Sequence, residues 1–205
     1  AWPETKSKTR GSGAARAWIQ SEVEQISRDC NTCIEVKRQI WVVEGEERIP
    51  GPTEIVNVLA VQRGATDPDR YVVISGDIDS RVSDVMDAKS DSPGANDNAS
   101  GVAAVLEAAR VLSKYKFSAS IVYAALSGEE QGLFGGKAMA AKALADGWLI
   151  DAVLNNDMIG NIEGINGVID NTHARIFSEG TRVVESPEEA IQRRFQGGEV
   201  DSASR

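Results

Sequence analysis

The sequence predicts an α/β protein, a three-layer sandwich around a mixed β-sheet whose central strands are parallel. Three short, continuous apolar runs lie at residues 71–74, 121–126 and 152–154. Runs of this kind are typical of strands that are buried on both faces. Helical patterns at residues 102–112 and 133–144 separate the runs. A strand-helix-strand order requires right-handed crossovers between largely parallel strands.

The N-terminal part predicts one helix followed by two strands at the edge of the sheet. Apolar residues recur at helical spacing between residues 14 and 30, and Ser12 can cap this helix. Residues 34–42 alternate between apolar and polar side chains, which indicates a strand with two unlike faces. A loop rich in Gly and Pro at 44–53 leads to a second strand at 55–61. We expect these two strands to form an antiparallel edge.

The two helices between the central strands differ in their patterns. Residues 102–112 are apolar almost all round, which predicts a deeply buried helix. Residues 133–144 carry a single apolar stripe that includes Phe134, Ala138 and Ala141. We therefore expect the second helix to cover the sheet with one face only.

Size and charge limit the classes of function. The 205 residues fit one domain, residues 1–205, that can bury a core. The formal net charge of -9 argues against nucleic acid and anionic membranes as partners. No apolar run approaches the roughly 18 residues that span a bilayer. The chain begins Ala1-Trp2-Pro3 without Met, which favours a processed or trimmed chain.

The two cysteines, Cys30 and Cys33, lie at the end of the first predicted helix. A zinc ribbon would need a second pair of cysteines, and a thioredoxin-like motif would begin a helix rather than end one. The spacing is compatible both with a local disulfide and with two free thiols. A disulfide would indicate an oxidising compartment.

Acidic residues follow each of the three apolar runs. Asp77 and Asp79 follow the first run, Glu129 and Glu130 follow the second, and Asp157 follows the third. A fourth polar group, Asn96-Asp97-Asn98, directly precedes the buried helix. Ligands of open α/β sheets bind outside the carboxyl ends of the strands, so we expect these carboxylates to converge there.

Several carboxylates within a few Å of one another repel, and a divalent cation removes that conflict. Each group alone also has a simpler interpretation. Residues 77–79 could form a polar loop, residues 96–98 a helix cap, and Glu129 and Glu130 a favourable charge at a helix N-terminus. A buried Asp157 needs a partner. Four such groups in order favour a metal site over four unrelated features.

The same stretches resemble peptidase family M28. The matching segments are Gly-Asp-Ile-Asp-Ser-Arg at 76–81, Pro-Gly-Ala-Asn-Asp-Asn-Ala-Ser-Gly at 93–101, Ser-Gly-Glu-Glu-Gln-Gly-Leu-Phe-Gly at 127–135 and Asn-Asn-Asp-Met-Ile-Gly at 155–160. The resemblance covers roughly residues 55–180. It implies a zinc-peptidase-like fold, a peptide substrate and a secreted or periplasmic protein.

The resemblance also implies roles for the acidic residues around two zinc ions. Asp97 would bridge the two ions, Asp157 would bind one of them and Glu130 the other, and Asp77 would be a further metal ligand. Glu129 would be the general base, which takes a proton from water and passes it to the leaving amine. Asp79 would assist catalysis by orienting the residue at position 77.

Two departures from the family pattern matter. The family usually has His where this chain has Asp77, and an oxygen-richer site favours harder ions such as manganese, magnesium or calcium. The family also supplies a last His ligand far beyond the position of Asp157. The only histidine here, His173, lies in a stretch that does not resemble that ligand loop. We therefore expect a surface role for His173 and a missing C-terminal part that carries the last ligand.

The sequence thus predicts a metal-dependent peptidase, an aminopeptidase rather than a carboxypeptidase, in which this fragment alone is weak or inactive. Two alternatives stay open. One is a catalytically impaired M28-like module for binding or structure, and the other is an acyltransferase of the glutaminyl-cyclase type. The sequence carries no signal for oligomeric state or side-chain specificity.

Overall fold

The computed structural model describes residues 11–87, 89–164, 167–172, 177–178 and 201–202. The chain divides into two compact units, Ala1–Asn161 and Ile162–Arg205. The first unit holds the sheet and its helices. In the second, β6 (Phe177–Ser178) pairs antiparallel with β7 (Asp201–Ser202), and Glu163 and Ile169 form an isolated bridge. Whether residues 1–205 behave as one domain stays a prediction.

The sheet of the first unit has five strands in the order β1-β2-β4-β3-β5. Their bounds are β1 (Ile34–Val43), β2 (Thr53–Gln62), β3 (Asp67–Asp77), β4 (Ala119–Leu126) and β5 (Leu149–Asn155). β1 pairs antiparallel with β2, and β2 pairs antiparallel with β4. β3 lies between β4 and β5 and is parallel to both. The predicted mixed sheet with a parallel centre and an antiparallel edge is confirmed.

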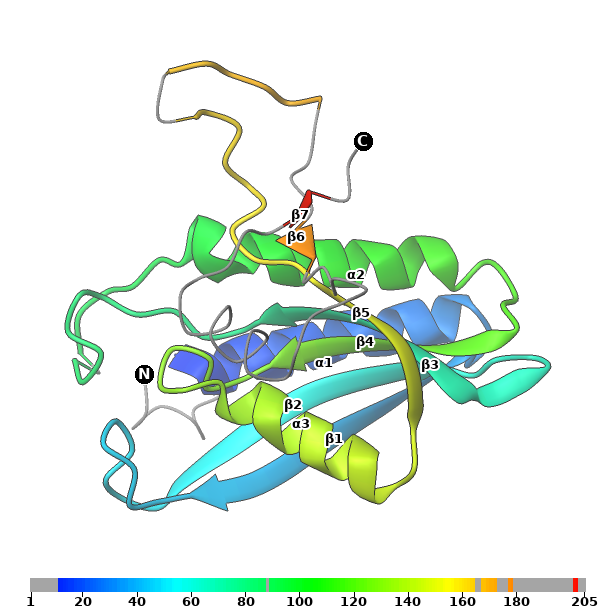
Figure 1. The fold of residues 1–205 in the computed structure, drawn as a ribbon, viewed down its shortest axis with the longest axis horizontal. Coiled ribbons are helices and arrows are strands. Elements are labelled where there is room, and N and C mark those ends of the chain that lie inside the picture. Colours follow the sequence, from blue (N-terminus) through cyan, green and yellow to red (C-terminus); the bar gives the residue numbers. More distant parts are fainter. Residues whose placement is uncertain (1–10, 88, 165–166, 173–176, 179–200, 203–205) are drawn as a thin grey trace, which may run out of the picture. The chain divides into compact units, whose positions relative to one another are not determined.

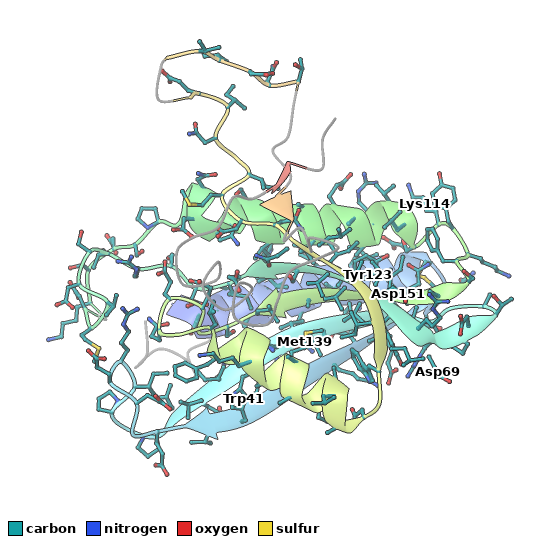
Figure 2. The ribbon with its side chains drawn as sticks, in the orientation of Figure 1. Trp41, Asp69, Lys114, Tyr123, Met139 and Asp151 are labelled. Atoms are coloured by element: carbon teal, nitrogen blue, oxygen red, sulfur yellow. A yellow bond between two sulfur atoms is a disulfide. The ribbon has the colours of Figure 1, made fainter. Side chains whose placement is uncertain are left out.

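Three helices complete the layers: α1 (Gly11–Asp29), α2 (Gly101–Leu112) and α3 (Phe134–Ala145). α1 and α2 pack on one face of the sheet and α3 on the other (Figure 1). Alternate residues of a strand point to opposite faces. Ala60, Ile121 and Tyr123 therefore pack with the α1 and α2 side, whereas Val122 and Ala124 pack with Met139 of α3. Figure 2 labels Tyr123 and Met139, which belong to these two separate cores.

α2 is less buried than its apolar sequence predicts. Val102, Val105 and Ala109 are buried, but Val111 is exposed, as are the charged residues Glu107 and Arg110. The helix lies in an outer layer and contacts the sheet with one side, so its outward side faces solvent. The prediction of a deeply buried helix is wrong for that outward side.

β5 departs further from prediction. The run at residues 152–154 predicts a strand buried on both faces, but every residue of β5 is exposed. Val153 and Leu154 keep 58% and 54% of their surface accessible. β5 is the edge strand of the sheet, and it pairs with β3 alone among the described strands. Its apolar side chains therefore lack the cover that their sequence calls for.

The end of α1 is tied to the start of β1. Cys30 and Cys33 form a disulfide across a turn in which Asn31 and Thr32 both have a φ of 58°. Ser27 donates its hydroxyl to the carbonyl of Ile34 at 2.6 Å. Of the two states that the sequence allows for the cysteines, the structure contains the disulfide. No helix among the described residues has both the length and the apolar character to cross a bilayer.

Candidate metal centre

The parallel strands bring the acidic segments to one edge of the sheet. Asp77 at the end of β3 is in register with Leu126 at the end of β4, and Ser75 is in register with Asn155 at the end of β5. β3 and β4 therefore end at the same level and β5 ends two residues earlier, so that the acidic residues at and just after these ends lie at one edge. Figure 2 labels Asp69 and Asp151 at the other end of the sheet, where β3 and β5 begin.

The start of α2 packs against the same edge through glycines. A Cβ on Gly76 would lie 2.7 Å from the carbonyl carbon of Gly101. A Cβ on Gly101 would lie 2.1 Å from the carbonyl oxygen of Asn156. Only glycine permits such close approach of the backbone. The segment that precedes α2 is thereby placed beside the end of β5.

Asn98 joins that segment to the chain after β5. Its side chain is almost fully buried, at 2% exposure. It donates to the carbonyl of Asn156 at 2.9 Å and accepts from the N–H groups of Gly101 and Met158. The side chain thus fixes Asp97 next to Asp157. The sequence indicated only turn chemistry for Asn98, because its partners are 58 and 60 residues away for the two bonds beyond β5.

Asp79 lies against the segment that follows β4. Its carboxylate accepts hydrogen bonds from the backbone N–H groups of Gly128, Glu129 and Glu130, at 2.8, 3.3 and 3.1 Å. The expected task of Asp79 was to orient residue 77, but these bonds run to residues 128–130. Burial raises the pKa of Asp79, and the backbone donors oppose that rise.

Two arginines hold Glu130. Arg81 Nε donates to Glu130 Oε2 at 2.5 Å, and Arg48 Nη1 donates to the backbone carbonyl of Glu130 at 2.9 Å. The Glu130 side chain is only 11% exposed. The carboxylate that was expected to bind a metal is therefore paired with a guanidinium in this structure. Neither arginine was singled out from the sequence, because an ion pair across 49 residues leaves no local pattern.

The acidic residues act on one another electrostatically. Burial, followed by the charges of Asp79, Glu129 and Asp157, raises the pKa of Asp77 to about 7, and a hydrogen bond with Asn98 opposes the rise. Burial raises the pKa of Glu129, with further contributions from nearby carboxylates, the largest from Glu130. Burial and the charge of Asp97 raise the pKa of Asp157. Such mutual effects require that these carboxylates lie near one another.

A divalent cation fits this set of donors in charge and in chemistry. The groups are carboxylates, which bind zinc and harder cations through oxygen, and a cation would relieve the repulsion that raises their pKa values. Within the described part of the chain, however, no group of three or more His, Cys, Asp or Glu side chains has the spacing to hold a metal ion. His173 lies outside the described residues. The assignment of Asp77, Asp97, Glu130 and Asp157 as ligands stays a prediction.

Comparisons with known proteins agree with the resemblance. The model of "Peptidase family M28" matches residues 57–201. A probable zinc metalloprotease of Leptosphaeria maculans is 41% identical over 202 residues, which are 98% of this chain and 47% of that protein. The chain spans less than half the length of these curated relatives, which include probable zinc metalloproteases of two Pyrenophora species.

Two solved structures share the fold at low sequence identity. A glutaminyl cyclase of Porphyromonas gingivalis has a TM-score of 0.59 at 21% identity, over 74% of this chain and 54% of its own. The LapA aminopeptidase of Legionella pneumophila has a TM-score of 0.51 at 22% identity, over 72% of this chain and 37% of its own. At such identities the two structures support the fold alone.

Proposed function

The chain belongs to peptidase family M28, and from that premise we propose that it carries the metal-binding core of a zinc peptidase that removes N-terminal residues from peptides. One observation supports the proposal above the others. The register of β3, β4 and β5 brings acidic side chains to a single edge of the sheet, where burial and then mutual charge raise the pKa values of Asp77, Glu129 and Asp157. A site of this kind suits a metal-dependent hydrolase better than a passive surface.

In the proposed site, Asp77, Asp97, Glu130 and Asp157 would hold the metal. Bound zinc would lower the pKa of water and polarise the scissile carbonyl. Glu129 then takes the proton from the attacking water and delivers it to the leaving amine. Burial and neighbouring charge raise the pKa of Glu129, which brings a carboxylate closer to the range in which a general base works best.

A second candidate is an M28-like module with impaired catalysis. Two observations favour it: Asp77 replaces the usual His, and Arg81 occupies the carboxylate of Glu130. A glutaminyl-cyclase-like acyltransferase is a third candidate, since a glutaminyl cyclase shares the fold. For location we propose a secreted protein, because the disulfide between Cys30 and Cys33 is of a kind that persists in oxidising compartments.

The test compares wild type with Glu129→Gln in the longest natural chain that contains these residues. Aminoacyl-nitroanilides and a glutaminyl peptide serve as substrates, after metal removal and after the addition of zinc or manganese. We expect metal-dependent release of nitroaniline that falls about 10²–10⁴-fold in Glu129→Gln, with bound zinc unchanged by elemental analysis. Glu107→Gln is the matched control, because Glu107 is an exposed residue of α2 that pairs with Arg110.

The other outcomes separate the alternatives. No release with any divalent metal would support the impaired module, and cyclisation of the glutaminyl peptide without release would support the acyltransferase. Equal rates for wild type and Glu129→Gln would remove Glu129 as the base.

A further inference from the structure

The carboxylate of Asp79 binds the backbone of residues 128–130. Asp79 is buried, at 8% exposure, two residues beyond the end of β3. Oδ1 accepts from the N–H groups of Gly128 and Glu129, and Oδ2 accepts from the N–H of Glu130. One carboxylate oxygen therefore binds the backbone of Gly128 and Glu129, and the other binds the backbone of Glu130.

The backbone of the segment is shaped to receive this carboxylate. Gly128 has a φ of 76°, in the left-handed region. Successive N–H groups can converge on an anion when a left-handed residue is part of the turn. Ser127, just before the segment, is fixed through its N–H to Asn57 Oδ1 at 3.0 Å and through its hydroxyl to the carbonyl of Val56 at 2.6 Å. One end of the segment is thus anchored on β2, and Asp79 binds the three N–H groups that follow.

The residue type at position 77 is consistent with the bonds that Asp79 accepts from residues 128–130. A histidine there would offer a ring N–H as a donor. The carboxyl group of Asp77 has no N–H donor, and in its ionised form it repels the carboxylate of Asp79. The backbone N–H groups of residues 128–130 are donors without such repulsion. In this chain the N–H groups of residues 128–130 are therefore better partners for the acceptor oxygens of Asp79 than the side chain of Asp77 is.

We propose that Asp79 is a positioning residue for both glutamates of the site, fixing Glu129 and Glu130 through their backbone N–H groups. This inference rests on the proposed function, in which Glu129 is the base and Glu130 a metal ligand. It assigns Asp79 no contact with substrate or metal. Loss of its carboxylate acts on metal affinity through Glu130 and on the rate through Glu129.

The first variant is Asp79→Asn, which has nearly the same shape. Its amide keeps one oxygen for Gly128 and Glu129 but turns an NH₂ group toward the N–H of Glu130, so that two donors face each other. We expect zinc affinity, measured by competition with a chromophoric chelator, to fall about 10–100-fold. Asp69→Asn, at the exposed opposite end of β3, is the matched control and keeps the affinity of wild type.

Double-mutant cycles then distinguish the two possible tasks of Asp79, because only residues that act together give non-additive effects. We expect the coupling of Asp79→Asn with Glu130→Gln to be larger than its coupling with Asp77→Asn, whose nearby charge also acts on Asp79. The reverse pattern would overturn the proposal and return Asp79 to residue 77. Unchanged zinc affinity in Asp79→Asn would also overturn it.

A further experiment, on hydrogen exchange, needs no metal. In metal-free protein, the amides of Gly128, Glu129 and Glu130 should exchange with solvent at least about tenfold faster in Asp79→Asn than in wild type. Unchanged exchange would contradict the proposal even if zinc affinity fell. Faster exchange in a protein that binds no zinc would uphold the positioning and refute the proposed function.

A second variant, Gly128→Ala, tests the proposal even if Asp79→Asn does not fold. Gly128→Ala strains the left-handed residue while it leaves Asp79 intact. It should speed the exchange of the same amides and lower zinc affinity in the same way. If Gly128→Ala folds but changes neither amide exchange nor zinc affinity, the backbone of residues 128–130 does not position the two glutamates, and the proposal is wrong.

Discussion

In the proposed metal site, Asp77 would influence which metal is preferred. It is buried among other acids, and its pKa is raised to about 7. A neutral histidine at this position would bring a nitrogen ligand and remove one negative charge from the cluster. Since imidazole suits zinc and carboxylate suits harder ions, we expect Asp77→His to bind zinc more tightly, by about tenfold in a competition assay with a chromophoric chelator.

The control for this substitution is Asp69→His, on the same strand and exposed at its opposite end. It should leave zinc affinity unchanged. Weaker zinc binding by Asp77→His would argue that the oxygen ligand is the better one in this site.

For single residues, the sequence predicted which side chains lie near one another but not which hydrogen bonds and ion pairs each one forms. Asp77, Glu129 and Asp157 could be placed together because they follow strands that end at one edge, and their mutual effects on pKa agree. The bonds of Asn98 to residues after β5 and the pairing of Arg81 with Glu130 could not be predicted. Such contacts depend on the rotamers of distant side chains, which leave no periodic pattern.

Among the secondary-structure elements, the start of α3 leaves no room for a side chain at Gly135. A Cβ on Gly135 would lie 2.3 Å from the backbone oxygen of Ser127 and 2.7 Å from Asn57 Oδ1. Asn57 is fully buried and bonds to both the carbonyl of Gly135 and the N–H of Ser127. We expect Gly135→Ala to destabilise the protein by about 1–3 kcal/mol through overpacking, as a lower midpoint in urea unfolding.

The neighbouring glycine supplies the control. A Cβ on Gly136 would meet only Leu126 Cδ1, at 3.9 Å. Gly136→Ala should therefore be neutral or should stabilise the helix by up to about 1 kcal/mol. Equal effects of the two substitutions would mean that α3 does not depend on close packing against the end of β4.

The elements themselves were largely predictable, whereas their burial was not. Hydrophobic periodicity located β3, β4 and the helices because local sequence determines which faces must be covered. The same signal predicted burial for β5 and for all sides of α2, which the structure does not show. Hydropathy shows that a strand needs cover on both faces, but it does not identify the segment that provides it.

For the molecule as a whole, the acidic cluster makes the stability of the metal-free protein depend on pH. The pKa of Asp77 is raised above its ordinary value to about 7. Between about pH 4 and 7 the folded state therefore holds a proton that the unfolded state has released, and stability from this group falls as the pH rises. We expect the free energy of unfolding in the presence of a chelator to drop by about 2 kcal/mol from pH 5 to pH 7.

The variant Asp77→Asn should flatten this dependence in urea titrations at the two pH values, and Asp69→Asn should preserve it. A metal-free wild type that becomes more stable as the pH rises over this range would show that Asp77 is not held in a repulsive cluster.

Because the end of α1 carries a disulfide, a dithiol reagent can act on this molecule in two ways, on the disulfide and on zinc in the proposed site. Dithiothreitol would open the Cys30–Cys33 link by thiol exchange, freeing the junction of α1 with β1. Its thiolates would also compete for zinc as soft ligands. Loss of activity in such a reagent would therefore reflect chelation, reduction or both, whereas a phosphine reductant would act mainly on the sulfur bridge.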